Sequence, residues 1–226
     1  YYRNLRVTNP SNYLYFYDFG DYQIIGASPE SLVSVKQGQV TTNPIAGTRP
    51  RGKDEREDKA LAEELLADEK EVAEHRMLVD LGRNDIGKIV QNKSVEITKY
   101  MEVEYFRYVM HLTSVVRGQL LPQLTAMDAL KSTLPAGTVS GAPKIRAMKR
   151  IYELEQEKRG IYAGAIGYLS ATGDMDVAIA IRTMILKNGR AYVQAGAGIV
   201  YDSIPTNEYQ ETINKAKSMT KIGEMQ

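Results

Sequence analysis

The chain has 226 residues, of which 43% are hydrophobic and 25% charged, and its 29 basic and 28 acidic side chains give a net charge of +1. This near balance gives no electrostatic reason to expect a nucleic acid or an anionic membrane as a partner. The absence of cysteine excludes disulfides, thiolate metal sites and cysteine nucleophiles, and it fits a reducing, cytoplasmic location.

The chain shows no sign of a membrane segment or of an internal boundary. Its longest apolar runs, such as residues 161–169, are too short to span a bilayer. It begins at Tyr1 without an initiator methionine or a secretory pattern, so we expect it to be part of a longer parent protein. No linker rich in proline or serine interrupts it, so we expect one domain over residues 1–226.

The first part of the chain is predicted to be rich in strands. Glycine, aspartate and proline separate the expected strands at 13–17, 22–27, 32–36 and 39–45. A hairpin turn is expected at Gln37-Gly38, and a loop rich in glycine and arginine over 46–53. An apolar stripe then predicts a long helix over 55–81, with Asp54 as N-cap and Gly82 at its end.

The second part alternates hairpins and helices. Strands are expected at 95–103 and 107–117, a short helix at 124–130, and a loop at 137–142 that opens a helix over 143–158. Further strands are expected at 161–170, 177–186 and 191–194, with turns at Gly173-Asp174 and Asn188-Gly189, before a C-terminal helix from 206. Long antiparallel hairpins with a few long helices predict an α+β fold with helices covering sheet faces.

Two Glu-x-x-Glu pairs are the first candidates for chemistry. Glu71 and Glu74 are three residues apart on an expected helix, as are Glu208 and Glu211, so each pair shares a helix face. Carboxylate oxygens from two such pairs suit a hard divalent ion such as Mg²⁺. For either pair alone, the alternative is a solvated helix face.

Three glycine-rich segments could let backbone N–H groups approach an anion closely. They are residues 45–49, 135–144 and 195–199, and the second leads into a helix N-terminus. None of them matches a Walker A motif or a dinucleotide fingerprint. Each could equally be a tight turn.

Arg182 and two histidines are further candidates. Arg182 lies in the apolar segment 177–186, where it either binds a carboxylate ligand or forms an internal salt bridge. His75 and His111 could transfer protons near neutral pH, although a lone histidine in a strand, such as His111, is more often structural.

Several segments together resemble one family. These are the segments PIAGTRPRG at 44–52, EHRMLVDLGRND at 74–85, the loop at 135–144, and the stretch from QAGAGIV at 194–200 to Glu208 and Glu211. The whole chain is similar to the chorismate-binding enzymes, which include anthranilate, aminodeoxychorismate, isochorismate and salicylate synthases. The resemblance implies a layered α/β/β/α sandwich of largely antiparallel sheet covered by helices.

Two details resemble the catalytic, C-terminal part of the anthranilate synthase large subunit (component I). Aminodeoxychorismate synthases commonly carry a nucleophilic lysine where this chain has Ala46. The loop AGTVSGAP at 136–143 is similar to the anthranilate form rather than to the aminodeoxychorismate form. Two alternatives remain open, namely an aminodeoxychorismate synthase and a non-catalytic domain that binds metal and carboxylate.

The resemblance implies a role for each matching residue. Glu74 and Glu211 match direct Mg²⁺ ligands, and Glu71 and Glu208 match supporting ones. Glu30 matches a general acid, while His111 and Thr138 match polar residues beside the reacting ring. Residues that match substrate contacts are Gly47, Thr48, Tyr162, Arg182, Gly196, Ala197, Gly198 and Lys215.

The implied reaction converts chorismate and ammonia to anthranilate and pyruvate, the first step of tryptophan biosynthesis. Ammonia would come from glutamine through a partner amidotransferase subunit (component II), because this chain has no cysteine nucleophile. Tryptophan would be a feedback inhibitor of the parent protein. Asn12, Tyr13 and Leu14 match its regulatory segment, with substitutions at Asn12 and Leu14.

The resemblance also implies that family members are about twice as long as this chain. We therefore expect the chain alone to be weakly active or inactive, because exposed strand edges and an exposed apolar core face favour association.

Overall fold

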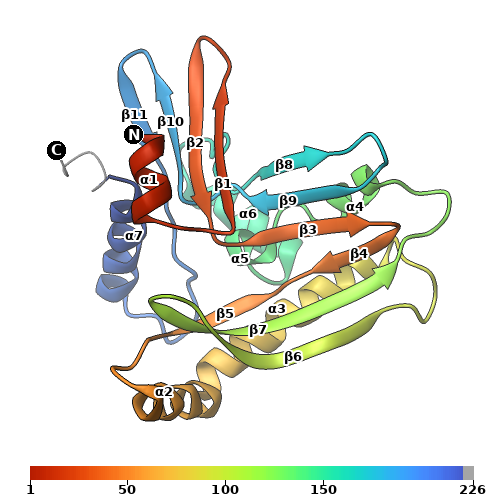
Figure 1. The fold of residues 1–226 in the computed structure, drawn as a ribbon, viewed down its shortest axis with the longest axis horizontal. Helices are drawn as coiled ribbons and strands as arrows, with labels where there is room; N and C mark the ends of the chain where they lie inside the picture. The colour runs from red at the N-terminus through yellow and green to blue at the C-terminus, as the bar shows by residue number, and fades with distance from the viewer. Residues whose placement is uncertain (221–226) are drawn as a thin grey trace. The chain divides into compact units, whose positions relative to one another are not determined.

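A computed structural model describes residues 1–220, which form two compact units (Figure 1). Unit 1 comprises Tyr1–Ser31, Thr138–Gly167 and the described chain from Val177 onward. Unit 2 comprises Leu32–Gly137 and Tyr168–Asp176. Each unit therefore combines segments that are far apart in the sequence.

Unit 1 is built on an antiparallel sheet with the strand order β1-β2-β10-β11. Its strands are β1 (Tyr13–Asp18), β2 (Tyr22–Ser28), β10 (Thr183–Lys187) and β11 (Arg190–Val193). The helices of this unit are α1 (Tyr2–Thr8), α6 (Lys144–Leu154) and α7 (Pro205–Thr220). The short α5 (Gly137–Ser140) lies at the boundary between the two units.

The core of unit 1 lies between this sheet and two helices, α1 and α7 (Figure 1). Leu5 of α1 and Met219 of α7 are fully buried, and they pack in one cluster with Ile25 and Met184 of the sheet. Burying a side chain of this size stabilises a fold by roughly 1.5–3 kcal/mol. The pattern of the first 45 residues predicts only strands, so α1 was not expected.

Unit 2 contains a sheet whose long central strand is β7 (Val109–Gln119). The sheet order is β5-β7-β4-β3-β9-β8, and β6 also pairs with β7. The remaining strands of this sheet are β3 (Ser31–Lys36), β4 (Gln39–Thr42), β5 (Ile45–Pro50), β6 (Glu96–Tyr105), β8 (Ala165–Leu169) and β9 (Met175–Ile179). Only residues 168–169 of β8 and 175–176 of β9 belong to unit 2.

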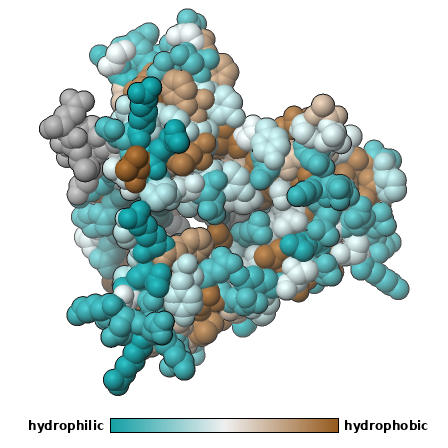
Figure 2. Space-filling model, viewed as in Figure 1, coloured by the Kyte–Doolittle hydropathy of each residue, from teal (hydrophilic) through white to brown (hydrophobic). Residues whose placement is uncertain are grey.

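The helices of unit 2 are α2 (Glu55–Ala67), α3 (Glu69–Gly87) and α4 (Ala126–Thr133). Ala62 and Leu65 of α2 form a buried cluster with Met110 and Leu112 of β7. The outer face of α2 is mainly hydrophilic, as Figure 2 shows. Helices packed on antiparallel sheets confirm the predicted α+β class.

The glycine-rich segment after Pro44 is a strand and not the predicted loop. β5 pairs with β7 from Ile45 to Pro50, with a register shift between Ala46 and Thr48. Gly47 supplies the extra residue of this bulge and has a φ of +74°, which glycine adopts without strain. The prediction failed because glycine usually weakens a strand, whereas here it bends the strand.

The single helix predicted over 55–81 is two helices. The carboxylate of Asp68 accepts hydrogen bonds from the N–H groups of Lys70 and Glu71, so it ends α2 and caps α3. Asp54 caps α2 as predicted. Gly82 does not end the helix, because α3 continues to Gly87; a Cβ at Gly82 would lie 3.0 Å from Thr42 Oγ1, so glycine allows close packing on β4.

The strand predicted over 177–186 is also interrupted. β9 ends at Ile179, β10 begins at Thr183, and Arg182 between them has a φ of +49°. The left-handed region is uncommon for a residue other than glycine and is a reason to examine the site. The hairpin turns at Gln37-Gly38 and Asn188-Gly189 are confirmed, with positive φ at all four residues.

Within residues 1–220, every helix is too short or too polar to cross a membrane.

We predict that Asp68→Ala lowers the free energy of unfolding by about 1–2 kcal/mol, the usual loss for a helix N-cap. The N–H of Glu71 and the guanidinium of Arg49 hold the pKa of Asp68 below its usual value. The difference between wild type and variant should therefore be present at neutral pH and disappear as the pH falls below about 4. Urea denaturation at several pH values measures it, with the exposed Glu63→Ala as control. An equal loss in both variants would contradict the capping role.

Candidate functional site

The first group of predicted site residues surrounds the carboxyl of Glu30 in unit 1. Glu30 follows β2, and its carboxyl accepts a hydrogen bond from the hydroxyl of Thr138. Burial raises the pKa of Glu30 to about 7, against the opposing effects of Thr138, Arg182 and Lys215. A carboxyl with this pKa carries a proton about half of the time at neutral pH, as a general acid requires.

The backbone around Glu30 is fixed by the strand break. The N–H of Ile179 donates to the carbonyl of Glu30 over 3.0 Å, and the hydroxyl of Ser28 donates to the carbonyl of Ile179 over 2.7 Å. On the other side of the break, the N–H of Ala27 donates to the carbonyl of Arg182 over 3.1 Å. These hydrogen bonds join the end of β2 and the segment after it, which carries Glu30, to the end of β9 and the segment before β10, which carries Arg182.

Arg182 is partly buried, and burial lowers its pKa against the influence of Tyr162, Glu30 and Glu211. Tyr162 also lies against Gly196, where a Cβ would be 2.8 Å from the tyrosine hydroxyl. Only glycine therefore lets the backbone at 196 approach this ring so closely. The structure thus brings together five of the predicted site residues, with Glu211 beside them; the five are Glu30, Thr138, Tyr162, Arg182 and Gly196.

Lys215 of α7 joins this group. Its ammonium donates to the carbonyl of Gly196 over 3.2 Å, and it forms an ion pair with Glu211, one turn earlier on the helix. The lysine therefore links α7 to the glycine-rich segment. Gly198 has open space around it, and Ala197 and Glu208 line a separate hollow with Val200, Ser203 and Tyr209.

The second group lies in unit 2 around His111 of β7. Its Nδ1 is 2.9 Å from the carbonyl oxygen of Gly47 and 3.1 Å from Thr48 Oγ1. Because a carbonyl only accepts, Nδ1 carries the hydrogen, and the neutral ring keeps a lone pair on Nε2. Burial lowers the pKa of His111, against the bond to Gly47 and the charge of Glu104. The ring can thus accept a proton.

The pair Glu71 and Glu74 belongs to the same unit, on α3. Glu71 is partly buried, and burial raises its pKa, followed by repulsion from Glu74 and Asp68. Its carboxylate lies over β5, where a Cβ at Gly47 would be 3.2 Å from Glu71 Oε2. Arg49 lies 4.0 Å from Glu71 and donates to Asp68 and Glu64 over 2.8 Å each.

His75 has a structural environment. It is fully buried, and its Nε2 lies 2.6 Å from Ser114 Oγ, which also accepts a hydrogen bond from the N–H of Met101. Burial lowers the pKa of His75 to about 4, so the ring is neutral near pH 7. A ring closed off from solvent in this way does not exchange protons with a ligand, so the interpretation of His75 as a proton carrier is not supported.

The four glutamates fit Mg²⁺ by their chemistry, since they supply hard oxygen donors and Glu71 and Glu74 repel each other. The two pairs belong to different units, with Glu71 and Glu74 in unit 2 and Glu208 and Glu211 in unit 1. In the part of the chain that the structure describes, no group of three or more histidine, aspartate or glutamate side chains could hold a metal ion. The Mg²⁺ assignment stays a prediction.

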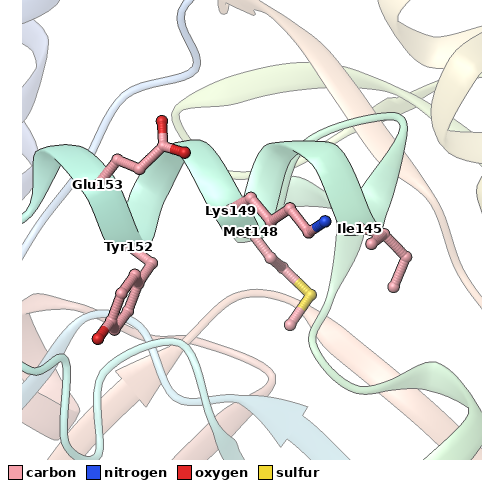
Figure 3. A pocket seen from close by; sticks show the side chains of 5 residues that line it. All are labelled: Ile145, Met148, Lys149, Tyr152 and Glu153. Atoms are coloured by element: carbon pink, nitrogen blue, oxygen red, sulfur yellow. The ribbon is translucent and has the colours of Figure 1, made fainter.

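Another surface hollow of unit 1 runs along α6, where Ile145, Met148 and Tyr152 extend from one side of the helix (Figure 3). Lys149 and Glu153 complete its lining. None of the predicted site residues lines it.

The predicted regulatory segment lies at the start of β1. Asn12 precedes the strand, and Leu14 packs against the core cluster between the sheet, α1 and α7. The structure also shows two residues that the sequence analysis did not single out as site residues, Arg49 and Arg159. Both hold the backbone or side chain of a predicted site residue. Arg49 lies within the glycine-rich segment 45–49, whereas no local sequence pattern marks Arg159.

Comparisons with known proteins agree with this arrangement. The family model of the chorismate binding enzymes matches residues 1–221, through both units. Anthranilate synthase component 1 of Lactococcus lactis is 65% identical over 224 residues, which are 99% of this chain and 49% of that protein. The chain belongs to the chorismate-binding enzyme family, and it spans about half the length of such relatives.

Solved structures of chorismate-utilising enzymes have the same fold as this chain. The crystal structure of anthranilate synthase component I from Streptococcus pneumoniae has a TM-score of 0.91 and 84% identity, covering 97% of this chain and 48% of that one. A putative 2,3-dihydroxybenzoate-specific isochorismate synthase from Bacillus anthracis has a TM-score of 0.83 and 29% identity, covering 99% of this chain and 61% of that one.

We predict that the two histidines titrate separately and that both are neutral at pH 7. His75 should titrate at about pH 4 and His111 below the usual value of about 6.5. Since the fold holds His75 neutral, the free energy of unfolding should fall as the pH drops below about 6.5. Proton NMR of the ring hydrogens measures both, with His111→Gln for assignment. A midpoint for His75 near 6.5 would show that its ring is not closed off.

Proposed function

We propose, from the chain's membership of the chorismate-binding enzyme family, that it carries catalytic machinery for converting chorismate and ammonia to anthranilate, pyruvate and water. The single observation that carries this proposal is the carboxyl of Glu30, with its pKa raised to about 7 beside two cations, Arg182 and Lys215. The names of relatives 65% and 84% identical to the chain support the choice of anthranilate as product. The reaction would be the first step of tryptophan biosynthesis.

Glu30 would act as the general acid of the first step. Ammonia adds at ring carbon C2, the double bonds shift, and the C4 hydroxyl takes the proton of Glu30 and leaves as water. The hydroxyl of Thr138 holds the carboxyl in one orientation. In the second step the ring loses its C2 hydrogen as a proton and the bond from C3 to the enolpyruvyl oxygen breaks. The enolate that leaves takes up a proton and becomes pyruvate.

The groups around Glu30 would bind the two carboxylates of the substrate. Arg182 offers a planar fork that suits a carboxylate, and the backbone at Gly196, Ala197 and Gly198 offers N–H groups. Tyr162 and Lys215 fix that backbone segment by their contacts with Gly196. Each of these is a substrate contact in the proposal.

In unit 2, Gly47, Thr48 and His111 would contact the substrate ring. Nδ1 of His111 is committed to the carbonyl of Gly47, so Nε2 is the nitrogen that would take up the C2 proton in the elimination. Glu71 and Glu74 in this unit, and Glu208 and Glu211 in unit 1, would hold Mg²⁺. When bound, the ion would neutralise charge on the ring carboxylate.

The proposal includes a partner and a regulator. Ammonia would come from glutamine through an amidotransferase subunit, component II, since a chain without cysteine cannot form the usual thioester of glutamine hydrolysis. The relatives' name, component 1, supports a partnered complex. Tryptophan would inhibit through a site that includes Asn12, Tyr13 and Leu14.

One observation favours a second reaction, the addition of water to give isochorismate. The structure of the isochorismate synthase from Bacillus anthracis shares the fold at 29% identity. Pyruvate release separates the two reactions, because only the anthranilate-forming route eliminates the enolpyruvyl group.

The natural polypeptide that carries this chain should form anthranilate and pyruvate in equal amounts from chorismate, ammonium and Mg²⁺. Anthranilate fluorescence and a coupled assay for pyruvate measure the two products. Removal of divalent ions with a chelator should abolish turnover, and added Mg²⁺ should restore it. Consumption of chorismate without pyruvate would favour the isochorismate or aminodeoxychorismate reaction, and no consumption would leave only a binding domain.

Glu30→Gln should reduce kcat by roughly 10²–10⁴-fold, the usual contribution of a general acid. Because the pKa of Glu30 is about 7 and the protonated form is the active one, the wild-type rate should fall as the pH rises above 7. The variant should lose this pH dependence. Glu157→Gln, at an exposed glutamate of unit 1, is the matched control. A Glu30 variant within twofold of the wild-type rate would remove Glu30 from the mechanism.

A further inference from the structure

Arg159 lies between α6 and β8 in the sequence, and each nitrogen of its guanidinium donates to a neighbouring group. Nε and Nη2 donate to the two carboxylate oxygens of Glu155 over 2.8 and 2.6 Å. Nη1 donates to the carbonyl of Val139 over 2.6 Å. The guanidinium also lies over the ring of Tyr162, 5.6 Å from its centre. A planar fork with donors in three directions is specific to arginine.

Two of these contacts lead directly into the group around Glu30. Val139 follows Thr138, whose hydroxyl hydrogen-bonds the carboxyl of Glu30. Tyr162 lies against Gly196 and beside Arg182. The backbone carries the second connection as well, because the N–H of Tyr162 donates to the carbonyl of Arg159 over 3.1 Å.

Arg159 itself is not among the groups that set the charge state of Glu30. Those groups are Thr138 of α5, Arg182 at the strand break and Lys215 of α7. An effect of Arg159 on Glu30 is therefore indirect, and its shortest route runs through the backbone of Val139 to Thr138. This separates a positioning role from a direct electrostatic one.

We propose that Arg159 is a positioning residue of the catalytic group, and that its contacts to Val139 and Tyr162 fix the Thr138 hydroxyl on the Glu30 carboxyl and the Tyr162 ring against Gly196. The inference deepens the proposed function and rests on it. It assigns to one arginine the relative placement of a proton donor and a substrate-binding segment.

The alternative is that Arg159 only ends α6 with an ion pair to Glu155. The same helix offers a matched control in Arg150, which forms an exposed ion pair with Glu153 over 2.6 Å. An arginine that serves only the helix should behave as Arg150 does. Arg159→Lys keeps the charge but cannot reach the three acceptors together.

The test uses the natural polypeptide that carries this chain, with kcat measured from pH 5 to 9. In Arg159→Ala we expect kcat to fall about tenfold to hundredfold, because small misplacements of catalytic groups have effects of this size. The hydrogen bond from Thr138 lowers the pKa of Glu30, so loss of that bond should raise this pKa. The high-pH limb of the rate profile, where kcat falls as Glu30 loses its proton, should then move to higher pH. Arg159→Lys should behave like the alanine variant, and Arg150→Ala should retain the wild-type profile.

Thr138→Val keeps the test decisive where the arginine variants fold poorly. It should move the high-pH limb in the same direction, and the double variant should move it no further, because both changes remove the same bond. A carbon-13 NMR titration of the Glu30 carboxyl measures the same shift without turnover, so it tests the inference even where the proposed reaction is absent. An unmoved Glu30 titration in Arg159→Ala, or full rescue by lysine, would overturn the inference.

Discussion

The interruption between β9 and β10 is the constraint on which the rest of unit 1 depends. Arg182 lies there in the left-handed region, so its side chain leaves the alternation that a continuous strand would impose. The exposed backbone groups of the break do not stay unpaired, because Ile179 and Arg182 bond to the segment that ends β2.

The same competition between burial and charge governs both groups of site residues. Burial raises the pKa of Glu30 and of Glu71, and in each case a nearby arginine opposes the rise. The two carboxyl groups differ, however, in the groups that face them. Glu30 also faces a hydroxyl that holds one orientation, which suits proton transfer, whereas Glu71 faces a second glutamate, and that repulsion would be relieved by a cation. The surroundings therefore suit Glu30 to proton transfer and Glu71 to binding a cation.

Local chemistry made some elements predictable. Gln37-Gly38 and Asn188-Gly189 define tight turns because both positions of each pair tolerate positive φ, and Asp54 precedes a helical stripe as a cap. The break between α2 and α3 at Asp68 was not predicted, because an aspartate among many charged residues is not recognisable as a helix N-cap. The break at Arg182 was missed because apolar residues continue on both sides of it, and only the pairing with β2 makes the interruption favourable.

Most of the site was predictable only through resemblance, although Arg182 is also a candidate as a charge in an apolar segment. Glu30, Thr138, Arg182 and Lys215 come from four different parts of the sequence, and no spacing rule links them. Their roles came from matching whole segments to a family, and the structure adds the contacts. Arg159 shows the limit of both approaches, since it lies in no glycine-rich segment and carries no implied role. Its significance depends on what it touches.

The hydrogen bonds that an arginine side chain already makes indicate whether it holds protein groups in place or binds a ligand. Arg159 uses all of its nitrogens on Glu155 and Val139, and Arg49 uses its own on Glu64, Thr48 and Asp68. In each of them every nitrogen already donates to a protein group, so these contacts favour a role in holding other groups in place. Among residues 1–220, the guanidinium of Arg182 forms no hydrogen bond or ion pair, although Glu30 and Glu211 act on it electrostatically. A partly buried guanidinium whose N–H groups have no acceptor is unfavourable. A carboxylate could accept two of these hydrogen bonds and neutralise the charge.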